Sequence, residues 1–80
     1  MKERPISHIF GERIRHLRTE KGLSQEQLAE LADLHRTFIG RIERGETNVT
    51  LENIKKLSQG LKVTISKLFD GPGKRAGQTK

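Results

Sequence analysis

The chain has 80 residues, which is the size of one small domain, and it contains no cysteine. A chain this short is a poor candidate for a deep catalytic cleft, and without cysteine it has no disulfide, thiol nucleophile or thiolate metal site. Sixteen Lys and Arg against ten Asp and Glu give a net charge of +6, which favours a polyanionic partner.

The sequence shows no sign of export or of membrane insertion. Residues 1–6 carry charges and a proline rather than the apolar run of a signal peptide. No stretch approaches the roughly 18 consecutive apolar residues that a transmembrane helix needs. We therefore expect a soluble, cytoplasmic protein without a membrane contact.

The first predicted element is a helix from about Ser7 to Lys21. Apolar residues recur there at helical spacing, with Ile14 and Leu17 on one face and either Ile9 or Phe10 before them. Gly22 then ends the helix, because glycine readily adopts the left-handed conformation of a helix stop.

The second predicted helix begins after Ser24 and is short. Ser24 followed by Gln27 has the spacing of a capping box, in which side chain and backbone bond reciprocally. Asp33 and Leu34 end this helix. Its apolar face consists of Leu28, Ala29, Leu31 and Ala32.

A third helix is predicted from about Arg36 to Arg44, with Ile39 and Ile42 facing inward and Gly45 at its end. Thr50 caps a fourth helix, on which Leu51, Ile54 and Leu57 share one face before Gly60 interrupts it. Thr64 caps a last short helix with Ile65, Leu68 and Phe69.

The expected fold is all-α, with five short helices in one bundle. Residues 1–6 form a flexible arm, residues 7–70 the domain, and residues 71–80 a disordered basic tail.

Charge is divided between the second and third predicted helices. The segment from Ser24 to Asp33 contains acidic residues and no basic one, whereas Arg36, Arg41 and Arg44 in the next segment stand against Glu43 alone. Two short helices joined by about three residues form a helix-turn-helix, in which the second helix enters the major groove. Ala29 lets the helices cross closely, Leu34 fills the corner, and the third helix leaves its polar face for DNA.

The run LSQEQLAELADLHRTFIGRIERGETNVTLENIKKL resembles the lambda-repressor-like, Cro/cI-type helix-turn-helix regulators, also called the Xre family. The resemblance extends roughly from Phe10 to Phe69 and rests on Gly-Leu-Ser-Gln, Leu-Ala and Ile-Glu-Arg-Gly. The phrase HRTFIGRIERGETNVTL is also similar to the controller proteins of restriction–modification systems. The resemblance implies a compact five-helix DNA-binding domain whose second and third helices make the helix-turn-helix.

The resemblance also implies roles for individual residues. Gln25 matches a phosphate-contacting position, Arg36 and Thr37 match base-reading positions, and Arg41 matches a site that faces bases or backbone. Thr47 and Asn48 match loop positions that touch the DNA backbone. Arg18 and Glu43 match a buried ion pair between the first and third helices.

The chemistry of these side chains agrees with such roles. The Arg36 guanidinium can fork onto guanine O6 and N7, a contact worth roughly 1–3 kcal/mol of discrimination. Phe38 would pack on a thymine methyl or a sugar if it faces the groove, and otherwise belongs to the core. His35 stands where the family has a Ser or Thr cap, and its ring could donate to a phosphate. Asp33 replaces a turn glycine, and Gly40 inside the helix suggests a close approach to DNA.

We expect a dimer, because one helix in one groove covers only a few base pairs of DNA. Regulators of this type usually bind palindromic sites as dimers. We expect the last helix to form the two-fold interface through Ile65, Leu68 and Phe69, although ordinary core packing is the alternative for these residues.

The predicted function is a dimeric, sequence-specific DNA-binding regulator of transcription that acts on a palindromic operator, associated with the nucleoid when bound. The alternatives are a restriction–modification controller protein or an antitoxin-like protein-interaction module. No catalytic constellation, metal-ligand spacing or phosphate loop is present in the sequence. We expect no enzyme activity, no cofactor and no small-molecule ligand.

Overall fold

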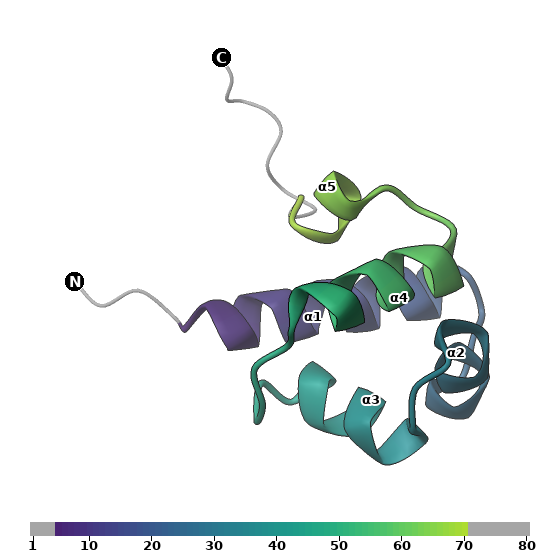
Figure 1. Ribbon diagram of the computed structural model, residues 1–80, viewed down its shortest axis with the longest axis horizontal. Coiled ribbons are helices and arrows are strands. Elements are labelled where there is room, and N and C mark those ends of the chain that lie inside the picture. The colour runs from purple at the N-terminus through teal and green to yellow at the C-terminus, as the bar shows by residue number, and fades with distance from the viewer. Residues whose placement is uncertain (1–4, 71–80) are drawn as a thin grey trace.

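The computed structural model describes residues 5–70, and within them the chain folds into five helices and no strand. The helices are α1 (Ile6–Glu20), α2 (Gln25–Ala32), α3 (Arg36–Glu43), α4 (Leu51–Leu61) and α5 (Ile65–Leu68). α2 packs against α3 and α4, while α1 packs against α3 and α5. Figure 1 shows α3 and α5 at opposite sides of the bundle. The predicted five-helix, all-α architecture is confirmed.

Local signals set the helix boundaries. The side chains of Ser24, Thr50 and Thr64 each accept a hydrogen bond from the backbone N–H three residues further on. At Ser24 the Gln27 side chain also accepts from the Ser24 N–H, so the predicted capping box is formed. Gly22 and Gly45 adopt φ angles of 72° and 73° at the ends of α1 and α3, a conformation that glycine reaches without strain.

The core lies where the helices meet and is made of aliphatic side chains. Ile39 and Ile42 of α3 are buried, as their inward placement predicted, and α1 contributes Ile14 and Leu17 to the same cluster. Burial of this face fixes the rotation of α3, so its opposite face points to solvent. The buried apolar residues are Phe10, Ile14, Leu17, Leu28, Ala29, Ala32, Ile39, Ile42, Leu57, Leu61 and Leu68.

Two expectations for the fourth helix are wrong. Gly60 does not interrupt α4, which continues to Leu61 and ends at Lys62, a residue in the left-handed conformation at φ 58°. A Cβ atom at Gly60 would lie 3.0 Å from the Cα of Ala32, so this glycine allows α4 to approach α2 closely. Leu51, predicted to share one face with Ile54 and Leu57, is 84% exposed. It is the first residue of α4, and its side chain does not reach the core.

The close approach at Gly60 gives a testable prediction for stability. Gly60→Ala is expected to destabilise the fold, because overpacking against the α2 backbone costs about 1–3 kcal/mol and exceeds the gain in helix propensity. The matched control is Gly40→Ala on α3, where the nearest atoms belong to the flexible side chains of Arg44 and Gln25. Urea denaturation should show a lower midpoint for the first variant and an unchanged or higher one for the second. Equal stabilisation of both would contradict the packing argument.

The predicted domain bounds are tested only in part. α1 begins at Ile6, so the first helix includes one residue that the prediction placed in the N-terminal arm. Residues 1–4 and the predicted tail, residues 71–80, lie outside the described residues. Among residues 5–70, none of the helices has the length and apolar character needed to cross a membrane.

Candidate nucleic-acid interface

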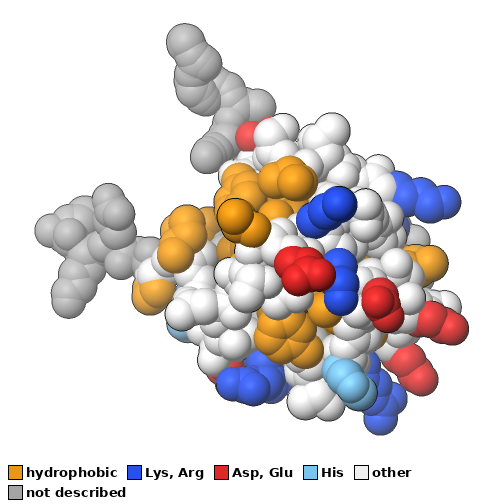
Figure 2. Space-filling model, in the orientation of Figure 1, with side chains coloured by type: hydrophobic (Ala, Val, Ile, Leu, Met, Phe, Trp, Pro, Cys, Tyr) orange, Lys and Arg blue, Asp and Glu red, His pale blue; other side chains and the backbone are white. Residues whose placement is uncertain are grey.

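The solvent face of α3 carries the polar side chains predicted to read DNA. Arg36, Thr37 and Arg41 are exposed, whereas Ile39 and Ile42 on the other face are buried. Lys and Arg side chains lie at the lower edge of the molecule, where α3 lies, as well as elsewhere on the same face (Figure 2). The helix therefore presents a basic, hydrogen-bonding surface on a rigid element.

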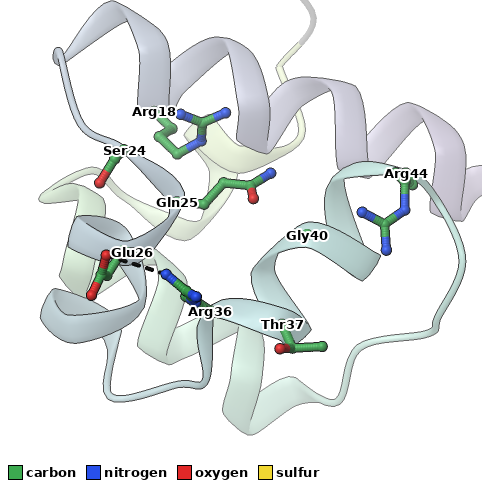
Figure 3. Close-up of a pocket in the computed structure, with 8 residues that line it drawn as sticks. All are labelled: Arg18, Ser24, Gln25, Glu26, Arg36, Thr37, Gly40 and Arg44. Atoms are coloured by element: carbon green, nitrogen blue, oxygen red, sulfur yellow. Dashed lines mark hydrogen bonds and ion pairs between the residues drawn. The ribbon is translucent and has the colours of Figure 1, made fainter.

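A polar groove separates the first turn of α2 from α3 (Figure 3). It has a volume of about 560 Å³ and brings Gln25 together with Arg36 and Thr37, three residues that the sequence assigned to DNA contact. Gly40 lines the groove between Gln25 and Arg44, so no side chain of α3 obstructs the space between these two polar groups. The lining residues are Arg18, Ser24, Gln25, Glu26, Arg36, Thr37, Gly40 and Arg44.

A buried polar network fixes α2 and α3 relative to α1. Arg18 on α1 donates from Nε and Nη2 to the two carboxylate oxygens of Glu43 on α3, at 2.6 and 3.0 Å. Its Nη1 donates to the carbonyl oxygen of Leu23, in the turn before α2. The hydrogen bond to Glu43 raises the pKa of Arg18, which favours its charged guanidinium.

Gln25 connects this network to the groove. Its Nε2 donates to Oε1 of Glu43 at 2.9 Å, while its Oε1 lies on the side of Gly40. An amide nitrogen carries two N–H groups, so one remains to donate outward while the other holds the side chain in place. The geometry suits Gln25 to a phosphate contact, which sets the position of a helix on DNA.

Two exposed ion pairs flank the groove. Arg36 Nη1 lies 3.4 Å from Glu26 Oε1, across the space between α3 and α2. Arg44 Nε lies 3.0 Å from Glu46 Oε2, and the hydrogen bond between them raises the pKa of Arg44 and lowers that of Glu46. Because both pairs are exposed to water, each stabilises the fold only slightly and can be broken by a ligand.

Other predicted contact residues lie outside this groove. His35 precedes α3 as its N-cap and is exposed, but its side chain makes no capping hydrogen bond. Phe38 is half-buried and packs against the core, and Arg41 is exposed beside the groove. In the described part of the chain no three His, Asp or Glu side chains are placed as metal ligands.

Thr47 and Asn48 line a second groove, on the side of the molecule formed by the start of α1 and the end of α5. This apolar groove of about 280 Å³ is lined by Ile6, Ser7, Phe10, Thr47, Asn48, Val49, Ile54 and Phe69. The Phe10 and Phe69 rings pack with centroids 5.2 Å apart. Hydrophobic side chains are exposed over the same region in Figure 2.

The predicted dimer residues of α5 divide into two groups. Ile65 and Phe69 are each 48% exposed, so both offer apolar surface, and Phe69 also lines the second groove. Leu68 has 0% exposure and belongs to the core, so its assignment to an interface is wrong. A four-residue helix needs one side chain to hold it to the bundle, and Leu68 has that position.

Sequence reasoning did not assign Arg44 or Glu26 to the interface, yet both line the groove. Arg36, Gly40 and Arg44 are spaced four residues apart, which places them on one helical face. That spacing was the signal that could have identified Arg44. Glu26 follows Gln25 directly, but its pairing with Arg36 depends on how α2 crosses α3.

Comparisons with known proteins agree with this geometry. The helix-turn-helix family model HTH_3 matches residues 14–68. The control protein C.SmaI of Serratia marcescens is 46% identical over 68 residues, which cover 85% of this chain and 81% of that protein. For the control protein C.BamHI of Bacillus amyloliquefaciens the identity is 49% over 66 residues, with coverages of 81% and 82%. The crystal structure of the restriction-modification controller protein C.AhdI from Aeromonas hydrophila superposes with a TM-score of 0.78 at 50% identity, covering 80% of this chain and 97% of that one.

Proposed function

The chain belongs to the HTH_3 helix-turn-helix family, and we propose that it is a sequence-specific DNA-binding regulator of transcription that acts as a dimer on a palindromic operator. The observation that carries the proposal is the division of α3 into two faces. Ile39 and Ile42 anchor the helix to the core, while Arg36 and Thr37 stand on its exposed face at its N-terminal end. In helix-turn-helix proteins this end of the second helix meets base edges in the major groove.

The contacts divide into reading and positioning roles. Arg36 donates to guanine O6 and N7, and Thr37 offers a methyl group to thymine or a hydroxyl to a base or phosphate. Gln25 donates to a phosphate from its place beside Glu43. Further contacts with DNA come from His35, Phe38, Arg41, Thr47 and Asn48.

The relatives favour a controller protein as the subtype. C.SmaI and C.BamHI are control proteins, C.AhdI is a restriction-modification controller, and the matched regions cover more than four fifths of each. We therefore place this protein among regulators that control a restriction–modification system.

We assign the dimer interface to the exposed part of α5 and to the apolar side chains of the neighbouring groove, Ile6 and Phe69, while Thr47 and Asn48 at the same groove keep their proposed role toward DNA. Phe69 lines that groove together with Ile6, which is 69% exposed, and Ile65 is an exposed apolar side chain of α5. Exposed apolar side chains concentrated at one place mark an association surface more often than scattered ones do. A second copy of this chain, related by a two-fold axis, would cover them and set the spacing of two α3 helices.

Substitution in α5 tests the interface. Ile65→Asn is expected to weaken dimerisation at least about tenfold, because a polar amide in a buried apolar contact removes roughly 1.5–3 kcal/mol of burial. The fold should persist, since Ile65 is half exposed at the first position of α5. Sedimentation velocity over a range of concentrations measures the change, with Leu31→Asn on α2 as the matched control. An unchanged dimer in the Ile65 variant would contradict the assignment.

Selection of bound duplexes from a random pool, at physiological salt, tests the function itself. The proposal predicts a palindromic consensus whose two halves are centred about 34 Å apart or at a multiple of that distance. Recovery of unrelated sequences would contradict sequence-specific regulation. An antitoxin-like module would instead bind a protein partner as its main ligand and retain little DNA preference.

A further inference from the structure

Glu26 is an unusual residue for the place it occupies. It is the only carboxylate that lines the α2–α3 groove within the described residues, and the groove faces the polyanion in the proposed function, on which this inference rests. Its side chain is 73% exposed and lies beside the arginine assigned to base reading. A negative charge near phosphates opposes binding, so its position at this surface calls for a physical reason.

The contact with Arg36 supplies that reason. Glu26 Oε1 lies 3.4 Å from Nη1 of Arg36, and Figure 3 shows the pair reaching across from α2 to α3. Among the described residues, no hydrogen bond occupies Nε or Nη2 of Arg36. A guanidinium has five N–H groups in a flat fork, so one edge can hold Glu26 while another edge reaches guanine O6 and N7.

We infer that Glu26 is a specificity-determining residue, which positions Arg36 for a guanine and opposes its use on a phosphate. A phosphate oxygen that approaches Arg36 also approaches the Glu26 carboxylate, and the two negative charges repel. Guanine O6 and N7 are acceptors on a neutral base edge, so Glu26 exerts no such repulsion on them. The pair thus weakens binding to arbitrary DNA more than binding to the operator.

Helix electrostatics offers a competing explanation for Glu26. An acidic residue in the first turn of α2 interacts favourably with the helix dipole and stabilises the fold slightly. That effect acts on folding alone and changes no ratio of DNA affinities. The two explanations are separated by measuring discrimination between duplexes together with thermal stability.

The decisive comparison uses the full chain carrying Glu26→Gln, with Glu30→Gln as the matched control. Both substitutions remove one negative charge from α2, but Glu30 is exposed and does not line the groove. Dissociation constants are measured at one salt concentration for three duplexes: the selected consensus, the consensus with the Arg36-contacted guanine replaced, and an unrelated sequence. Circular dichroism checks that each variant is folded at the temperature used.

Glu26→Gln is expected to lower the ratio of consensus to unrelated affinity by about two- to fivefold more than Glu30→Gln does, in line with the energies of exposed pairs. Discrimination at the guanine should fall by a similar factor. In an Arg36→Lys background the difference between Glu26→Gln and Glu30→Gln should vanish. A lysine ammonium has no second edge that could reach guanine while the first one holds Glu26. Equal effects of the two glutamine variants in the native background would overturn the inference and leave Glu26 with a net-charge role. Failure of the native chain to select any consensus would instead refute the proposed function.

Discussion

Arg36→Ala is expected to abolish the preference for one base pair in each half-site while leaving the rest of the consensus intact. The loss of a forked contact to guanine removes roughly 1–3 kcal/mol of discrimination, which is about five- to 150-fold in relative affinity per half-site. The side chain is 69% exposed, and its one hydrogen bond and ion pair among the described residues is with Glu26, so the fold should not change. Repeating the selection of bound duplexes with the variant measures the effect.

Arg15→Ala is the matched control for this prediction. Arg15 is exposed on α1 and does not line the groove, and its replacement removes the same positive charge. The control should weaken binding to all duplexes alike, because it changes only long-range attraction. If Arg36→Ala also weakened all duplexes alike and kept the full consensus, Arg36 would be a backbone contact and another residue would read the base.

Glu43→Ala is expected to destabilise the folded chain by about 3–5 kcal/mol, a large part of the stability of a small domain. The side chain of Glu43 is 3% exposed and that of Arg18 is 12% exposed, so the substitution leaves a largely buried arginine without its carboxylate. Gln25 loses its acceptor as well. Urea denaturation followed by circular dichroism measures the difference in free energy of unfolding.

Two further variants make that prediction specific. Glu46→Ala removes a carboxylate that is paired with Arg44 in water, and it should leave the free energy of unfolding nearly unchanged. Replacing both members of the buried pair, with Arg18→Met and Glu43→Leu, should destabilise less than the sum of the two single substitutions. Additive losses would mean that the pair contributes no coupling between α1 and α3.

Local sequence signals were sufficient to predict the order and type of the helices. Ser24, Thr50 and Thr64 are capping residues followed by apolar periodicity, and Gly22 and Gly45 occupy left-handed helix stops, so these five boundaries were encoded within a few residues. The two faces of α3 followed from the spacing of its isoleucines alone. These features depend on contacts within one turn of a helix, which is why a single sequence reveals them.

The errors concern packing between helices. Gly60 is a residue type that commonly ends helices, but here it allows α4 to approach α2 closely. Its neighbour is Ala32, 28 positions earlier in the chain, and no local pattern encodes such a contact. Leu68 and Phe69 are adjacent apolar residues, yet one faces the core and the other faces solvent. Which of the two is buried depends on how α5 docks, and this is set by the shape of the bundle.

The candidate site divides in the same way. Gln25, Arg36 and Thr37 were predicted from the resemblance to Cro/cI-type regulators, and the structure brings all three to one groove. The partners that hold them, Glu43 for Gln25 and Glu26 for Arg36, come from another helix in each case. A contact between helices depends on crossing angle and distance, so the supporting carboxylates could not be assigned from spacing.

The central claim, that α3 reads guanine in the major groove through Arg36, is tested most directly by removing N7 from the DNA. Replacing the contacted guanine of the selected duplex by 7-deazaguanine deletes one acceptor of the forked contact and preserves base pairing. We expect the native chain to bind this duplex at least about fivefold more weakly, while Arg36→Ala binds both duplexes equally. An equal loss of affinity in the native chain and the Arg36 variant would contradict the claim.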